Sequence, residues 1–159
     1  MHSLPPLKIR PGRLRDVPVI SRFNAALARE TEHRRLPSAR LRAGVGALIR
    51  DPAKGTYWVA TVGSRVVGQC LITFEWSDWR NGSFWWFQSV YVNRAHRGQG
   101  VFKALFQHVQ SLARARGNVC GLRLYMERDN APARQTYTRL GMKPTTYEVF
   151  EQDFVLPTH

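Results

Sequence analysis

The residues Arg97-Gly98-Gln99-Gly100 lie between strand-forming residues that end at Val92 and a run with helical spacing that begins at Val101. Glycine permits positive φ and lets another group come close to the backbone. The first N–H groups of a helix have no intrahelical acceptor and point outward, where they favour negative charge. A strand, a basic glycine turn and a helix in this order therefore predict a cradle for a phosphate group.

Two common phosphate-binding motifs do not fit this turn. A Walker loop would need the pattern G-x-x-x-x-G-K-[ST], which is absent here. A dinucleotide fingerprint would need a third glycine where Lys103 stands, and an acidic residue about twenty positions later. The turn therefore predicts an anion site without either nucleotide motif.

A second group of chemically capable residues is Glu75, Trp76, Asp78 and Trp79. The chain has 24 Lys and Arg against 11 Asp and Glu, so two carboxylates beside two tryptophans reverse the local charge. Carboxylates and indole faces attract a cationic amine. The alternative is a hairpin turned by Asn81-Gly82 whose tryptophans only pack, and both interpretations stay open.

Metal and redox chemistry have little support in the sequence. His33, His96 and His108 show no ligand spacing, so no metal site is expected. Cys70 and Cys120 each lie in an apolar, strand-like run without a CxxC pattern. We expect two buried free thiols and a reducing, cytoplasmic setting.

The apolar patterns predict elements that would position these residues in a single α+β domain over residues 1–159, with a core of about 7–154. The expected order is β α α β β β α β α β. Strands are expected at 7–10, on both sides of Gly63-Ser64 with a bulge at Gly68, at 83–92, at 118–126 and at 145–154. Helices are expected from near Asp16, at 38–49, at 101–116, and from Asn130 to the stop at Gly141.

The formal net charge is +13 and the pI is near 11.0, which would suit nucleic acid, a membrane surface or a polyanionic ligand. The arginines are scattered, without a block of like charge or an RNA-binding aromatic motif, so we expect most of them to be solvated. No run approaches the length of a membrane span, and the N-terminus lacks the apolar segment of a signal peptide. We expect a soluble protein without a nucleic-acid or membrane partner.

Two motifs make the chain resemble the GCN5-related N-acetyltransferase (GNAT) family. The acetyl-CoA motif R/Q-x-x-G-x-G/A is matched by Arg97 to Phe102, after the strand Ser89 to Val92, although Phe102 occupies the final Gly/Ala site. The second motif, N-x-x-A-x-x-x-Y, is matched by Asn130, Ala133 and Tyr137. The resemblance covers about Leu7 to Phe154. It implies a GNAT-like three-layer sandwich, in which a mixed, mostly antiparallel central sheet is flanked by helices.

The resemblance also implies acetyl-CoA as cosubstrate, no metal, and transfer of acetyl to a small-molecule or peptide amine. In this family backbone N–H groups of the central strand stabilise the oxyanion, which points to Ser89 to Val92, and Tyr137 would protonate the CoA thiolate. The family often forms homodimers. The residues that the resemblance assigns to acetyl-CoA are Val90, Tyr91, Val92, Arg97, Gly98, Gln99, Gly100, Val101, Phe102 and Asn130.

The general base is left open by the sequence. Many relatives use a carboxylate on the central strand, but here Gln88 occupies that region and cannot accept a proton. Glu75 is our candidate, with a water relay as the alternative, and Trp76, Asp78 and Trp79 are the candidate acceptor site. A non-catalytic CoA-sensing or nucleic-acid-binding module is the alternative function, which Tyr137 with Asn130 argues against because a binder would not need them.

Overall fold

The computed structural model of the protein describes residues 6–156, which fall into two compact units, 6–125 and 126–156. Each unit is described by itself. The first contains β1 (Leu7–Pro11), α1 (Val17–Glu32), α2 (Ser38–Arg50), β2 (Thr56–Val62), β3 (Arg65–Ser77), β4 (Gly82–Val92), α3 (Val101–Ala115) and β5 (Val119–Arg123), with short 3-10 turns η1 (Leu14–Asp16) and η2 (Arg94–His96). The second contains α4 (Ala131–Arg139).

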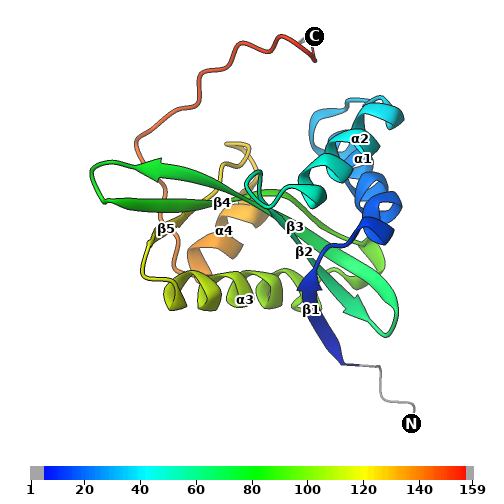
Figure 1. Ribbon diagram of the computed structural model, residues 1–159, viewed down its shortest axis with the longest axis horizontal. Coiled ribbons are helices and arrows are strands. Elements are labelled where there is room, and N and C mark those ends of the chain that lie inside the picture. Colours follow the sequence, from blue (N-terminus) through cyan, green and yellow to red (C-terminus); the bar gives the residue numbers. More distant parts are fainter. Residues whose placement is uncertain (1–5, 157–159) are drawn as a thin grey trace. The chain divides into compact units, whose positions relative to one another are not determined.

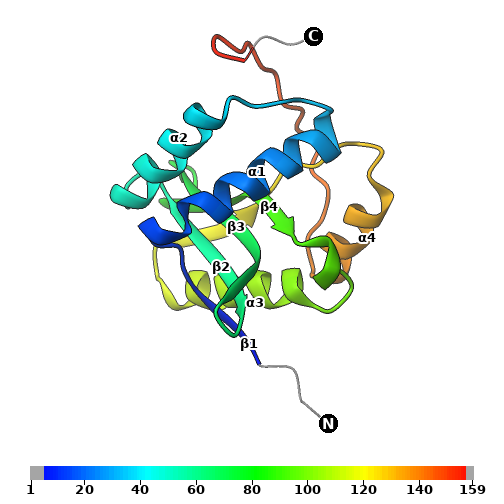
Figure 2. The ribbon, with the colours of Figure 1, turned by 90° about the vertical axis from the view of Figure 1, so that its right-hand side faces the viewer.

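The five strands of the first unit form one mixed sheet in the order β1-β2-β3-β4-β5. Successive neighbours are antiparallel except β4 and β5, which are parallel. Helices α1 and α2 cover one face of the sheet and α3 covers the other (Figures 1 and 2). The predicted α+β sandwich with a mostly antiparallel sheet is confirmed.

Both predicted hairpin turns form where the chain needs positive φ. Gly63 has φ 59° between β2 and β3, and Asn81 has φ 47° between β3 and β4. The bulge predicted at Gly68 is also present, because Ala60 pairs with Gly68 while Thr61 already pairs with Val66. These turns fix the register of the three central strands.

The sheet is packed on both faces by apolar stripes of the helices. On α3 the buried residues are Val101, Leu105, Phe106, Val109 and Ala113, as the helical spacing predicts. On the other face, Ile20 and Phe23 of α1 pack in a cluster with Tyr57 and Tyr91. Burial of each large apolar side chain contributes roughly 1.5–3 kcal/mol, so these stripes hold the strands that carry the site.

The start of α1 is tied to the sheet by the buried carboxylate of Asp16. The guanidinium of Arg10 donates to both of its oxygens at 2.7 and 2.9 Å, and the backbone N–H of Arg13 donates at 2.7 Å. Burial opposes ionisation of Asp16, but these hydrogen bonds and the neighbouring arginine charges outweigh burial and hold its pKa below the usual range. The polar contact therefore joins β1 to the first turn of α1.

One predicted strand does not form. The segment 145–154 was expected to be a strand, but it contains no regular structure. A strand requires a hydrogen-bonding neighbour, and α4 is the one helix or strand found among the described residues of the second unit. The alternation of apolar residues was therefore misleading in this segment, whereas α4 begins after Asn130 and is followed by Gly141 at φ 88°, as predicted.

The two cysteines are free, but their burial differs. Cys70 on β3 is fully buried, as expected. Cys120 is half-buried because β5 is an edge strand of the sheet, so the prediction of full burial was wrong for this residue. Across residues 6–156, no helix combines the length and the apolar character needed to cross a bilayer.

Candidate active site

Strand β4 contains a bulge at Ser89 and Val90. Gln69 of β3 pairs with Tyr91 and Leu71 pairs with Gln88, so Cys70 faces two residues of β4. Ser89 has φ 48°, in the left-handed region of backbone conformation, which residues other than glycine and asparagine adopt rarely. The bulge redirects the backbone groups of β4 at this point, and such strained positions cluster at functional sites.

A buried network of polar side chains holds the backbone of the bulge in place. The side chain of Gln69 is fully buried, and its Nε2 donates to the carbonyl of Ser89 at 3.1 Å and to Oδ1 of Asn24 at 2.7 Å. Asn24 in turn donates to the hydroxyl of Tyr57 at 3.2 Å. Burial raises the pKa of Tyr57 and keeps it a neutral phenol. Residues from α1, β2 and β3 thus fix the unusual backbone of Ser89.

Beyond Trp86, and so before the bulge is reached, β4 has no strand neighbour on one side among the described residues. Pairing between β4 and β5 extends from Ser83 to Trp86 and ends there, whereas β4 continues to Val92. Backbone groups on this edge of Phe87 to Val92 consequently face no strand among residues 6–156. At about 3.3 Å per residue, the unpaired edge is roughly 16 Å long and leads directly into the glycine turn.

The glycine turn has the conformation that the sequence predicted. Gly98 and Gly100 have φ 74° and 78°, both are exposed, and a Cβ at either would meet nothing within 4 Å among the described atoms. Helix α3 makes its first hydrogen bond from the N–H of Ala104 to the carbonyl of Gly100. The N–H groups of Val101 and the two residues after it therefore lack intrahelical acceptors and are available to an anion.

Arg97 is held by its neighbours on the turn. Its Nε donates to the carbonyl of Val92 at 2.9 Å, its Nη2 contacts Glu30 at 2.8 Å, and its guanidinium lies over the ring of Tyr91. Burial raises the pKa of Glu30, but hydrogen bonds from Arg97, Tyr91 and Arg94 outweigh it, so the pKa lies below its usual range. An anionic Glu30 therefore connects α1 to the turn.

Phe102, the departure from the family motif, lies on the first turn of α3. Its ring packs edge-on against Phe87 of β4, with centroids 6.3 Å apart, and near Phe106 at 6.1 Å. The side chain is half-buried in this aromatic cluster. Phe102 thus packs its ring between α3 and β4, while its backbone N–H keeps the position in the first helical turn that the motif requires.

Asn130 and Tyr137 belong to the second unit. Oδ1 of Asn130 accepts a hydrogen bond from the N–H of Ala133 at 3.1 Å and so caps α4. Tyr137 is half-buried on α4, and burial raises its pKa, which keeps the phenol protonated at neutral pH. The two residues therefore share one short helix, with Asn130 fixing where that helix begins.

The candidate base Glu75 is distant from the bulge. Glu75 pairs with Phe84, and it lies five residues along β3 from Cys70, or roughly 16 Å at 3.3 Å per residue. Its carboxylate forms an ion pair with Arg123 of β5 at 2.5 Å. On β4 itself, Gln88 donates to Thr73 at 2.5 Å. The structure thus brings neither a carboxylate of β4 nor Glu75 to the bulge.

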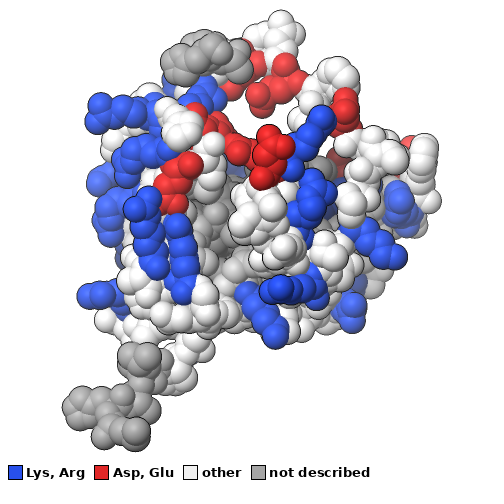
Figure 3. All heavy atoms as spheres, turned by 180° about the vertical axis from the view of Figure 1, so that it is seen from behind, with Lys and Arg blue, Asp and Glu red and all other residues white. Residues whose placement is uncertain are grey.

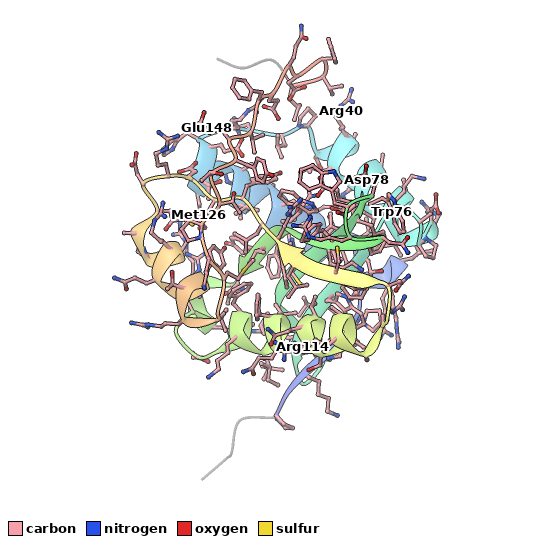
Figure 4. The ribbon with its side chains drawn as sticks, turned by 90° about the vertical axis from the view of Figure 1, so that its left-hand side faces the viewer. Arg40, Trp76, Asp78, Arg114, Met126 and Glu148 are labelled. Atoms are coloured by element: carbon pink, nitrogen blue, oxygen red, sulfur yellow. The ribbon has the colours of Figure 1, made fainter. Side chains whose placement is uncertain are left out.

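Trp76 and Asp78 lie at the turn end of the β3–β4 hairpin (Figure 4), and Trp79 follows Asp78 in the same turn. Trp76 and Trp79 are 62% and 83% exposed, so they do not serve as core residues. Oδ1 of Asp78 accepts from the N–H of Trp79 at 3.0 Å within the turn. The structure groups these side chains with Glu75, but places the group at the end of β4 opposite to the glycine turn.

Sequence reasoning missed Gln69, Asn24 and Glu30. Each lies within an ordinary strand or helix, and none carries a motif. A polar residue inside the apolar run of β3 was the one signal that could have singled out Gln69, because buried amides require partners. Within residues 6–156, no group of three or more His, Cys, Asp or Glu side chains is arranged to hold a metal ion.

Comparisons with known proteins agree with this geometry. The family model described as the acetyltransferase (GNAT) family matches residues 22–142. A possible acetyltransferase from Clostridium difficile 630 is 42% identical, with a TM-score of 0.87 over 97% of this chain and 100% of that one. A search of curated proteins gave no match.

Two more distant structures show the same fold. The ribosomal-protein-alanine N-acetyltransferase from Brucella melitensis biovar Abortus 2308 is 21% identical, with a TM-score of 0.75 over 94% of this chain and 100% of that one. A predicted acetyltransferase from Clostridium acetobutylicum, whose structure was determined with acetyl-CoA, is 14% identical, with a TM-score of 0.74 over 92% and 96% of the two chains. From the matched family model and the 42% identical relative, the chain belongs to the GNAT family of acetyltransferases.

Proposed function

We propose that the protein transfers an acetyl group from acetyl-CoA to a primary amine by direct attack. The observation that carries this proposal is the bulge at Ser89, which opens onto an unpaired strand edge that leads into the glycine turn. The edge offers backbone groups to the amides of the pantetheine arm at Val90 to Val92. The turn offers N–H groups from Gly98 to Phe102 to the pyrophosphate.

Arg97 acts in this proposal as a positioning residue. Its contacts with Val92 and Glu30 hold the turn in place, so the pyrophosphate is bound by backbone N–H groups, with the positive charge of the arginine close by. Gln99 similarly donates from its side chain to the carbonyl of Ala95 at 3.1 Å, which leaves its backbone N–H as the group offered to the ligand.

The acetyl group is placed at the bulge. The amine nitrogen attacks the thioester carbon, and the resulting oxyanion is stabilised by backbone N–H groups of Ser89 to Val92. Collapse breaks the C–S bond, and the thiolate takes the proton of the Tyr137 hydroxyl. At reference pKa values of about 10 and 8.5 this transfer is uphill by roughly 2 kcal/mol, and the raised pKa of Tyr137 increases the cost somewhat.

The amine must lose a proton before it attacks, because its pKa is near 10. Glu75 is about 16 Å from the bulge along β3 and is paired with Arg123, so direct transfer to this carboxylate does not fit the geometry. We propose that the proton leaves through water instead. Gln88 and Thr73, which lie on the strands beside the bulge, offer polar groups to such a relay.

The distance to the hairpin also bears on the acceptor class. A small amine at the bulge does not reach Trp76 or Asp78, whereas an extended peptide covers about 16 Å in five residues. If the hairpin contributes to acceptor binding, the acceptor is therefore a peptide or protein amine, with basic residues that interact with the carboxylates and indole rings.

The test is release of free CoA from acetyl-CoA in the presence of an amine panel that includes small amines, N-terminal peptides and lysine peptides. Acceptor-dependent release, with acetylated product identified by mass, supports the proposal. A protein that binds CoA tightly but releases none with any acceptor would instead be a CoA-sensing module. Binding of DNA that weakens steeply with salt, without transfer, would favour a nucleic-acid-binding module.

A further inference from the structure

A cleft of about 740 Å³ in the first unit lies between the start of α1 and the turn that joins β2 to β3. Its walls come from η1 and α1, from Gly63 to Val66, and from Asn93 at the end of β4. The volume is within the range of small-molecule sites, roughly 300–1,000 Å³. Neither the glycine turn nor the bulge lines this cleft.

The cleft is strongly basic. Four arginines line it, namely Arg10, Arg15, Arg22 and Arg65, against the single carboxylate of Asp16. Both oxygens of Asp16 already accept hydrogen bonds from the Nη1 and Nη2 groups of Arg10. Among the described residues, Arg15, Arg22 and Arg65 form no salt bridge with any carboxylate. The charge of Arg15 acts on Asp16 at longer range, but none of the three guanidinium groups forms an ion pair among the described residues.

The arginines beside the glycine turn and on β5 are arranged differently, because each has a carboxylate partner. Lys and Arg atoms cover much of the face in Figure 3, so a basic surface alone does not mark a site. However, the arginines beside the glycine turn, Arg94 and Arg97, are both paired with Glu30, and Arg123 is paired with Glu75. Unpaired arginines gathered at a cleft repel one another, and a bound anion would relieve that repulsion.

The positions of the three unpaired arginines fit more than one anionic group. Arg15 lies in η1 and Arg22 on α1, seven residues or about two helical turns later, which is roughly 10 Å along the axis, whereas Arg65 is the first residue of β3, beside the hairpin turn. Guanidinium groups bind phosphate oxygens in pairs through parallel N–H donors. The hydroxyl of Ser64 adds a polar group, and Val19 and Phe23 supply an apolar wall.

We propose that this cleft binds a small ligand that carries two or more phosphate groups. The site is separate from the acetyl-CoA site proposed above, because its helical wall is α1, on the face of the sheet opposite to α3 (Figure 2). Asn93 lies where the two meet: it lines the cleft, and its Oδ1 accepts from the N–H of Ala95 in the turn η2 that precedes Gly98. A ligand in the cleft therefore contacts the segment that leads into the glycine turn.

The experiment uses pyrophosphate and tripolyphosphate as probes, with calorimetry and thermal unfolding of the full chain. We expect tripolyphosphate to bind more tightly than inorganic phosphate and to raise Tm, and binding should weaken between about 50 and 200 mM salt. The variant Arg15→Gln, Arg22→Gln, Arg65→Gln should lose at least about tenfold in affinity, equal to about 1.4 kcal/mol. These side chains are exposed, so folding should be retained, which circular dichroism checks.

Two controls distinguish this cleft from other causes of binding. The variant Arg40→Gln, Arg42→Gln, Arg114→Gln removes the same charge from exposed arginines outside the cleft and should bind normally. Equal losses in both triple variants would mean diffuse attraction and would overturn the proposal. Gly100→Val tests whether the probe binds at the glycine turn instead. Tripolyphosphate binding that disappears in this variant but persists in the cleft variant would place the probe at that turn and would overturn the proposal.

A short single-stranded oligonucleotide completes the experiment. If it binds the wild type and the cleft variant equally and does not displace tripolyphosphate, it uses another surface and the proposal stands. If it depends on the three cleft arginines and binds far more tightly than tripolyphosphate, the cleft serves a nucleic acid, and the assignment to a small ligand is wrong.

Discussion

Strand β4 has a turn at each end, and the two turns carry chemistry in different ways. The glycine turn at its C-terminal end presents backbone N–H groups from residues with positive φ. The hairpin at its N-terminal end presents side chains, among them Trp76, Asp78 and Trp79. The strand between them is 11 residues long, or about 33 Å. A site formed by backbone N–H groups can be predicted from a few consecutive residues in the sequence. A site formed by side chains depends on strand register and on distances that the sequence does not show.

The largest effect on activity is expected from a residue outside both turns, Tyr137, and the effects of changing the turns can be compared with it. Tyr137→Phe removes the proposed proton donor to the thiolate and should lower kcat roughly 10²- to 10⁴-fold. CoA affinity should stay within a few-fold, because the hydroxyl is not proposed to bind the cosubstrate. Steady-state kinetics and CoA titration check both. Wild-type turnover in a folded variant would make Tyr137 a packing residue.

The glycine turn should give the next largest effect. Gly98→Val with Gly100→Val places β-branched residues at φ near +75°, where each costs about 1–2 kcal/mol, so the turn should adopt another shape. CoA affinity should fall roughly 30- to 10³-fold, as measured by calorimetry. Gly117→Val is the matched control, since Gly117 also has open space around it but no positive φ. Unchanged affinity in a folded double variant would exclude the turn as the binding site.

The support of the turn by Glu30 predicts a pH dependence. The pKa of Glu30 is lowered in the folded protein, so its ion pair with Arg97 contributes stability above the usual carboxyl pKa of about 4.3 and loses it as pH falls through the lower folded value. Glu30→Gln should therefore flatten the fall of Tm below about pH 4.3 and weaken CoA binding a few-fold at pH 7.

Glu32→Gln is the control for this effect, because Glu32 lies on the same helix and its contact with Arg34 is longer, at 3.6 Å. The same acid profile in wild type and Glu30→Gln would mean that the ion pair does not stabilise the fold. Asp16 titrates in the same direction and remains in both variants, so the flattening is partial.

The hairpin should give the smallest effect, and an effect on the acceptor alone. Asp78→Asn and Glu75→Gln should raise the KM of a basic peptide about two- to fivefold, the range of an exposed contact with a cation, and leave CoA affinity unchanged. Small amines should show no change in either variant. A large fall in kcat for Glu75→Gln would instead make this residue the base and would require the hairpin to approach the bulge. Unchanged peptide kinetics would leave the hairpin a structural turn.

Local signals predicted most of the fold. Asn81-Gly82, Gly63 and the stripe of α3 each specify their geometry within a few residues, so the hairpins and the helix were predicted correctly. The prediction of a strand at 145–154 was wrong because alternating apolar residues show that a strand could form but do not supply a neighbouring strand for it to pair with. The separation of Glu75 from the bulge also depended on a register that no local pattern contains.

The bulge itself shows the limit of the local signals. A glycine in the sequence indicates where positive φ or a bulge can occur, and Gly68 predicted the bulge of β3 correctly. Serine gives no such indication, so the positive φ of Ser89 could not be predicted. Its conformation depends on Gln69, twenty residues earlier, and on Asn24 of α1. The arginine cleft was missed for a similar reason, because the sequence shows scattered arginines, and the fold brings together three that form no ion pair among the described residues.

The unequal burial of the two thiols provides a built-in reporter of sheet opening. Cys120 is half-buried on an edge strand, so an alkylating reagent should label it in the native state. Cys70 lies inside the sheet opposite the bulge, and burial raises the pKa of its thiol, so labelling there requires β3 and β4 to separate. The rate of the second alkylation would then measure how often the strand that carries the bulge opens, and whether bound CoA keeps it closed.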